Sequence, residues 1–292
     1  MPSLRPVSRV LQAQTQQEGG GFVVRRPFPV PGLVQLDPFL LLDEMGPVDY
    51  APGEAVGAPD HPHRGFETVT YLLEGDWEHE DSAGNRGHLA AGGVQWMTAG
   101  AGVVHSELPS ARIRENGGRV HGFQIWVNLP RRDKMMAPRY QDIPGGRLPE
   151  RTSPDGLARV RLLAGEALGG KAVIETRTPV LLHDWTLSPG AQVDVPVPPE
   201  FQVFGYVFGG VLRAGPEGRE VRDGQAALFG AGESVRLAVP PGATGPARLL
   251  LLGGVPLGEP VARYGPFVMN TPEEIHQAIV DFQAGRLGAI DR

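Results

Sequence analysis

The sequence contains no cysteine, and this absence removes a whole class of chemistry. Without thiols the chain can form no disulfide bond and can offer no thiolate to a metal ion. A metal site in this protein would have to use histidine, aspartate, glutamate or backbone oxygen as ligands. Clusters of these residues are therefore the first place to look for function.

Long apolar segments and clustered positive charge are also missing. No run of about 18 apolar residues occurs, and the opening "MPSLRPVSRVLQAQTQQEGGG" has no apolar stretch of signal-peptide length. The 27 basic residues are outnumbered by 33 acidic ones, and the arginine pairs in "VVRRPFP" and "LPRRD" are interpreted as solvated surface. We expect a cytoplasmic protein that contacts neither a membrane nor nucleic acid directly.

Glycine and proline are plentiful, at 41 and 29 of 292 residues, and they separate short apolar runs. Runs such as "FETVTYLL" and "HGFQIWVNL" occupy 22–130, and a second block follows over 159–258. This pattern predicts an all-β protein built as sandwiches or barrels. "NTPEEIHQAIVDFQAG" differs, because it combines an N-cap at Thr271 with apolar residues at helical spacing. It predicts a C-terminal helix that Gly285 ends.

The length suggests two domains of about 100–150 residues each. We predict an N-terminal barrel over 1–135, a polar, proline-rich linker over 136–158, and a C-terminal barrel with the helix over 159–292. "FETVTYLLEG" aligns with the later "FQVFGYVFGG", which indicates an internal duplication. In the second copy the slots of His105 and Glu107 fall on or beside Leu237 and Val239, so only the first copy keeps polar groups there.

Histidines in "DHPHRGFETV" and "VVHSELP" have the spacing of metal ligands. Alternate side chains of a strand share a face, so His61 and His63 can meet one ion, and His105 and Glu107 repeat this spacing. Three imidazoles and one carboxylate suit Fe, Ni, Cu, Mn or Zn, and leave two positions of an octahedral ion open for substrate and O₂. A single His-x-His pair would more often be a solvated or structural pair, but the second pair and its loss from the duplicate favour a metal site.

Glu67 competes with Glu107 for the carboxylate role. It lies an even number of residues from His61 and His63, so it would share their face of a straight strand. In such a strand it would lie about 13 Å beyond His63. It would reach the ion only through a bend or bulge at Gly65. The remaining histidines occur singly and are not expected to bind metal: His79, His88, His121, His183 and His276.

"HPHRGFETVTYLLEG", "VQWMTAGAGVVHSELP", "GFQIWVNLP" and "PFVMNTPEEIHQAIVDFQAGRLG" resemble the pirin family of the cupin superfamily, over nearly the whole chain. The resemblance implies two tandem cupin barrels of the double-stranded β-helix (jelly-roll) type, followed by a C-terminal helix. It also implies iron in the N-terminal barrel, bound by His61, His63, His105 and Glu107, and a metal-free C-terminal barrel. The general cupin motif would nominate Glu67, whereas pirins use the later carboxylate.

The resemblance implies two functions of different classes. One is a quercetin 2,3-dioxygenase-type oxidoreductase, in which a small aromatic flavonol binds the metal through its 3-hydroxyl and O₂ opens the central ring, releasing carbon monoxide. Glu107 or Glu67 would accept the hydroxyl proton. The expected cavity wall comprises Phe66, Trp96, Met97, Phe123 and Trp126.

The other function is a regulatory binding protein, in which the redox state of the metal controls docking to a transcription factor or a metabolic enzyme. A purely structural metal site is a third interpretation. The two open coordination positions argue against it, because structural sites are usually closed by their own ligands.

Overall fold

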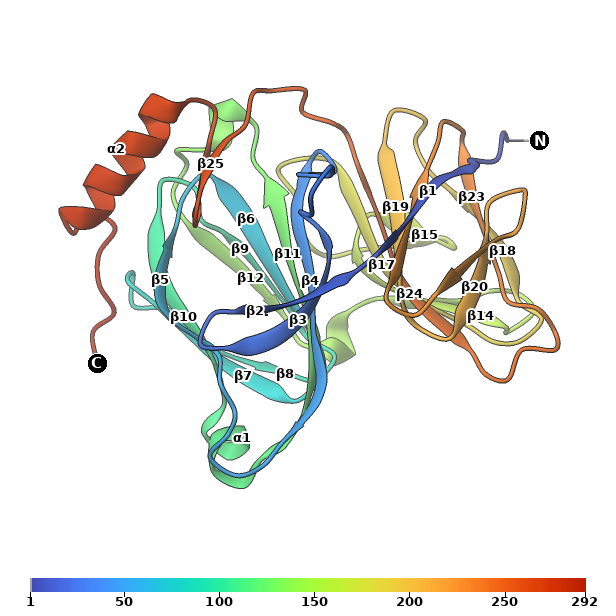
Figure 1. Cartoon of the computed structure of the whole chain (residues 1–292), viewed down its shortest axis with the longest axis horizontal. Helices are drawn as coiled ribbons and strands as arrows, with labels where there is room; N and C mark the ends of the chain where they lie inside the picture. The colour runs from blue at the N-terminus through green and yellow to red at the C-terminus, as the bar shows by residue number, and fades with distance from the viewer. Residues whose placement is uncertain (1) are drawn as a thin grey trace. The chain divides into compact units, whose positions relative to one another are not determined.

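The computed structural model describes residues 2–292 and divides the chain into two compact units. We call Thr15–Arg147 with Leu257–Arg292 the first barrel, and the chain up to Gln14 with Leu148–Pro256 the second barrel. Each unit contains a seven-stranded and a four-stranded antiparallel sheet (Figure 1). The predicted all-β fold with two barrels is confirmed, because short apolar runs between turn residues do form strands.

The seven-stranded sheet of the first barrel has the order β12-β9-β6-β11-β4-β3-β2. Its strands are β2 (Gln14–Glu18), β3 (Phe22–Phe28), β4 (Phe39–Tyr50), β6 (Phe66–Glu74), β9 (Val94–Thr98), β11 (Gly118–Asn128) and β12 (Arg139–Ile143). The first seven residues of β4 and of β6 are all buried. The middle of this sheet is therefore covered on both faces, which leaves room for only a few polar side chains, each held by a partner.

The four-stranded sheet of the first barrel has the order β5-β10-β7-β8 and carries the predicted site. Its strands are β5 (Ala58–His63), β7 (Asp76–Asp81), β8 (Arg86–Ala90) and β10 (Val103–Pro109). The same unit contains helix α1 (Ala111–Asn116), the 3₁₀ turns η1 (Arg131–Asp133) and η2 (Gly145–Arg147), and the hairpin of β25 (Ala262–Tyr264) and β26 (Phe267–Met269).

The second barrel repeats this plan with an apolar interior. The seven-stranded sheet contains β1 (Val7–Gln12), β13 (Glu150–Thr152), β14 (Ala158–Ala164), β17 (Val180–Leu187), β19 (Gln202–Gly209), β22 (Gln225–Phe229) and β24 (Ala247–Gly254). The four-stranded sheet contains β18 (Gln192–Pro196), β20 (Val211–Ala214), β21 (Arg219–Arg222) and β23 (Ser234–Ala238), and a short hairpin joins β15 (Glu166–Ala167) to β16 (Gly170–Lys171).

The duplication predicted from the sequence is visible in the sheet order. β6 lies between β9 and β11, and β19, which contains the aligned segment, lies between β22 and β24. Leu237 and Val239 are buried in the core of the second barrel, where they pack with Trp185 and Leu249. Apolar side chains therefore occupy the positions that correspond to His105 and Glu107.

The predicted C-terminal helix is present as α2 (Pro272–Gln283). Thr271 Oγ1 accepts a hydrogen bond from the Glu274 amide at 3.2 Å, and the Glu274 carboxylate accepts one from the Thr271 amide at 3.0 Å. This reciprocal capping fixes the start of the helix. Ile275 and Ala278 then pack with Val104 of β10 in the first barrel.

The two units differ from the predicted domains 1–135, 136–158 and 159–292 in three places. The segment after 257, including α2, belongs to the first barrel, and β1 pairs with β22 of the second barrel. The predicted linker contains β12, which pairs with β9. Apolar periodicity shows that a helix or strand has a face to bury, but it does not say which barrel receives that face.

Candidate metal centre

The three predicted histidines meet across one pair of antiparallel strands. In the β5–β10 ladder His61 lies opposite His105, and His63 lies opposite Val103. The ring centroids are 4.3 Å apart for His61 and His105, 4.7 Å for His61 and His63, and 4.9 Å for His63 and His105. One ring nitrogen of each histidine lies within 4.8 Å of those of the other two. Such spacing suits three ligands of a single ion.

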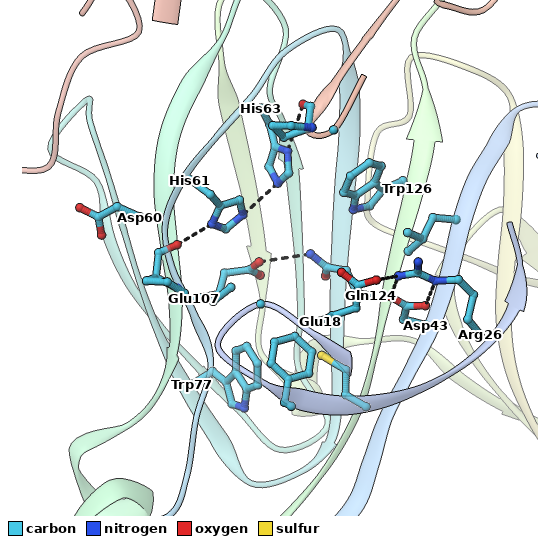
Figure 2. A pocket seen from close by; sticks show the side chains of 18 of the residues that line it. Glu18, Arg26, Asp43, Asp60, His61, His63, Trp77, Glu107, Gln124 and Trp126 are labelled. Carbon is cyan, nitrogen blue, oxygen red and sulfur yellow. Dashed lines mark hydrogen bonds and ion pairs between the residues drawn. The ribbon is translucent and has the colours of Figure 1, made fainter. Parts of the chain in front are cut away.

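The hydrogen bonds of His61 and His63 leave their Nε2 atoms available. Nδ1 of His61 donates to the Pro59 carbonyl at 2.7 Å, and Nδ1 of His63 lies 3.4 Å from the Pro266 carbonyl. The two Nε2 atoms then face each other at 3.0 Å (Figure 2). Because a carbonyl can only accept, each Nδ1 is the donor, and in the neutral ring Nε2 then carries the lone pair. A cation shared between them would remove their repulsion.

The environment keeps the buried histidines neutral, as metal ligands must be. Burial and the neighbouring His61 hold the pKa of His63 well below its usual value, with a smaller contribution from the positive charge of Arg263. Burial and then His63 and His61 do the same to the pKa of His105. His105 is 1% exposed, and neither of its ring nitrogens has a hydrogen-bond partner in the described chain. This orphaned imidazole fits a metal ligand.

Glu107 lies close to the histidines but is held by other residues. A register shift between His105 and Glu107 brings Glu107 opposite Ala58. Its Oε1 accepts a hydrogen bond from Thr70 Oγ1 at 2.6 Å, and its Oε2 accepts one from Gln124 Nε2 at 3.2 Å. The three histidines form the cluster, while Glu107 lines the adjoining cavity. Its role as the fourth ligand stays a prediction.

Glu67 lies on the opposite face of its strand from Thr70. β6 pairs regularly with β9, so its side chains alternate, and Thr70 points toward Glu107. Glu67 Oε1 instead accepts a hydrogen bond from Thr98 Oγ1 at 2.6 Å. Gly65, whose φ is +89°, interrupts the regular alternation of side chains between His63 and Glu67. Glu107, and not Glu67, is therefore the carboxylate that faces the cavity beside the histidines.

A cavity of about 520 Å³ opens beside His61 and His63. Of the five residues expected to line it, Trp126 does. Phe66, Trp96, Met97 and Phe123 are fully buried in the core. The wall is completed by segments that the sequence did not assign to the site, among them Phe22, Leu41, Met45, Trp77, Arg263 and Pro266.

A row of polar side chains crosses the floor of this cavity and was missed in the sequence. Gln124 lies opposite Asp43 on one side and Thr70 on the other, across β4, β11 and β6. Arg26, interpreted as solvated, is 9% exposed and bonds both carboxylate oxygens of Asp43, at 2.5 and 2.6 Å. The sequence signal that could have indicated this row is a single polar residue at the matching position of each apolar strand.

Profiles of known families match both barrels. The pirin profile matches residues 21–127, and the pirin C-terminal cupin domain matches residues 182–288. Pirin from Mus musculus is 43% identical over 293 residues, which cover 99% of this chain and 96% of that protein. The chain belongs to the pirin family.

Other relatives also match over nearly the whole chain. A pirin-like protein of Solanum lycopersicum is 44% identical over 285 residues, covering 97% of this chain and 93% of that one. The solved structure of quercetin 2,3-dioxygenase from Acinetobacter baumannii has a TM-score of 0.92 and 36% identity, covering 99% of this pirin-family chain and 100% of its own. Neither α1 nor α2 has the length and apolar character needed to span a bilayer.

Proposed function

We propose that this protein is a metal-dependent dioxygenase of the quercetin 2,3-dioxygenase type, which opens the ring of a flavonol-like substrate with O₂. The observation that carries the proposal is the convergence of His61, His63 and His105 beside a cavity that Glu107 also lines. The likeness to the Acinetobacter baumannii quercetin 2,3-dioxygenase supports it. The volume of about 520 Å³ is within the range of small-molecule sites.

The neutral, converging imidazoles fit a transition metal, and His61, His63 and His105 would hold it. We propose iron, with nickel, copper, manganese and zinc as alternatives, because nitrogen and carboxylate ligands accept all of them. As an alternative to acting as the proton acceptor, Glu107 would complete the ligand set if it left its hydrogen bonds to Thr70 and Gln124. The bound metal would supply Lewis-acid activation of the substrate hydroxyl and redox chemistry toward O₂.

Glu107 is the residue that we assign to proton transfer. Its carboxylate faces the cavity and would accept the proton of the substrate hydroxyl. Thr70 and Gln124 each donate to one of its oxygens, so the carboxylate is oriented before substrate arrives. Trp126, packed against Phe66 at a centroid distance of 4.3 Å, offers an aromatic face to a flat substrate.

The test is oxygen consumption by the iron-reconstituted protein with quercetin. A double variant, His61→Ala with His63→Ala, should lose turnover, while His276→Ala, which changes an exposed histidine of α2, should keep it. Turnover that survives in the double variant would contradict the proposed site. Metal bound without any turnover would instead favour the regulatory binding protein that the resemblance also implies.

A further inference from the structure

Among residues 2–292, two of the charged residues that line the cavity form no ion pair: Glu107, which is hydrogen-bonded to Thr70 and Gln124, and Arg263. Arg26 binds both Asp43 and Glu18, at 2.5 and 2.8 Å. Asp60 pairs with Arg292 at 2.5 Å. Arg263 also lines the cavity, yet among residues 2–292 it makes no ion pair with a carboxylate, and its one hydrogen bond goes from Nη1 to the Leu40 carbonyl at 3.2 Å. Most of its five N–H donors remain free.

Arg263 is exposed, and two contacts position its guanidinium: the hydrogen bond to the Leu40 carbonyl and the ring of Trp126. The central guanidinium carbon lies 4.7 Å from the centre of the Trp126 ring, a cation–π contact. The Trp126 ring in turn lies 5.2 Å from the His63 ring. Such stacking restricts the side chain before a ligand binds, which lowers the entropic cost of using it. The Arg263 guanidinium and the His63 ring therefore both lie against the Trp126 ring.

The element that carries Arg263 also contacts a proposed metal ligand. Arg263 is on β25, and Pro266, in the turn to β26, offers its carbonyl to His63 Nδ1. The β25–β26 hairpin thus contributes two groups to the cavity wall, the Arg263 guanidinium and Pro266, whose carbonyl faces His63 Nδ1. A ligand that reaches the histidines with one end would pass Trp126 and meet Arg263 with the other.

We propose that Arg263 determines specificity in this cavity, by selecting aromatic hydroxy compounds that carry an anionic oxygen, a carboxylate or an ionised phenol, remote from the metal-binding hydroxyl. A planar guanidinium recognises such oxygens by paired, charge-assisted hydrogen bonds. The existing ion pairs of Arg26 leave that arginine committed to Asp43 and Glu18, so Arg263 is the cation that a ligand can use. This inference rests on the proposed function and names its substrate class.

The test compares two ligands, 3-hydroxyflavone and its 4′-carboxylate, by calorimetric titration of the iron-loaded protein without oxygen. The carboxylate should bind the wild type about tenfold more tightly. Arg263→Gln should abolish this preference, and Arg263→Lys should retain part of it. Arg132→Gln, which removes an exposed arginine elsewhere in the first barrel, should leave it unchanged.

Equal affinities in the wild type, or an unchanged preference in Arg263→Gln, would overturn the inference. Quercetin turnover is measured on the same preparations to separate this inference from the proposed reaction. Turnover without a carboxylate preference would overturn the role of Arg263 alone. A preference that Arg263→Gln abolishes, without turnover, would support the role of Arg263 and contradict the proposed reaction.

Discussion

His61 and His105 lie directly opposite each other on the antiparallel strands β5 and β10, with their ring centroids 4.3 Å apart. Opposed residues on one face of a sheet are close neighbours, so these two rings meet without help from a loop. His63, two residues along β5, joins them from the same face. The candidate metal centre is thus built on paired strands, which hold ligands more rigidly than loops do.

The carboxylate that faces the cavity should control turnover. We expect Glu107→Gln to lower turnover per bound metal ion about 100-fold or more, because the amide cannot accept the substrate proton. Glu67→Gln is the matched control and should retain turnover within a few-fold, since Glu67 bonds Thr98 on the other face of β6. Steady-state oxygen consumption, normalised to metal content, measures both. A collapse in the Glu67 variant with Glu107→Gln still active would reverse the assignment.

Lys134 should make stability depend on pH. Its Nζ donates to the Gly65 carbonyl at 2.8 Å, to Asn128 Oδ1 at 2.6 Å and to the Val268 carbonyl at 3.1 Å, and burial lowers its pKa from 10.5 to about 8. Between these values the unfolded chain binds more protons than the folded chain, so the free energy of unfolding rises with pH across that window. Across that window the free energy of unfolding of the wild type should rise by roughly 3 kcal/mol relative to that of Lys134→Met.

Urea unfolding at pH values from 7 to 10.5 measures this difference. Lys171→Met is the matched control, because Lys171 is the other lysine of the chain and its side chain is exposed. The control should give a curve parallel to that of the wild type. A constant difference between wild type and Lys134→Met at all pH values would contradict the prediction.

The ion pair of Arg64 and Asp281 should fasten α2 to the residue that directly follows β5, the strand that carries His63. Arg64 Nη1 lies 2.7 Å from Asp281 Oδ2, and Arg64 Nε donates to the Ala101 carbonyl at 2.6 Å. The Arg64 guanidinium holds the pKa of Asp281 well below its usual range. A depressed carboxylate pKa stabilises the fold above the unfolded pKa, and the contribution is lost as pH falls toward the folded pKa.

Asp281→Asn should therefore raise hydrogen exchange of the α2 amides several-fold at neutral pH. Asp49→Asn removes an exposed ion pair with Arg119 in the same barrel and serves as the control. Unchanged exchange in α2 of the Asp281 variant would show that apolar packing alone secures the helix.

Much of the first barrel could be predicted because its signals are local. The His-x-His spacing indicates a shared face wherever the strand is regular, and both histidines of β5 do meet His105. Glu67 shows the limit of this reasoning, since the positive φ of Gly65 breaks the alternation on which its parity depended. Gly65 marked a possible bend in the sequence, but polar and apolar patterning does not say which way the following side chains then point.

Other features could not be predicted because they depend on long-range packing. The apolar face of α2 was visible in the sequence, but its partner Val104 was not. Arg263 is 200 residues from His63 in the sequence and reaches the same cavity through the β25–β26 hairpin. Segments so far apart come together by topology, which local patterns do not specify.

Metal content tests directly whether His61, His63 and His105 form the metal centre. Mass spectrometry should find a single metal ion per wild-type chain. His105→Ala should lose most of it while the chain stays folded by circular dichroism, since the second barrel accommodates Leu237 in the corresponding slot. His183→Ala should keep full occupancy, because it changes an equally buried histidine in the second barrel. Full occupancy in His105→Ala, or a clear loss in His183→Ala, would show that the metal is bound elsewhere.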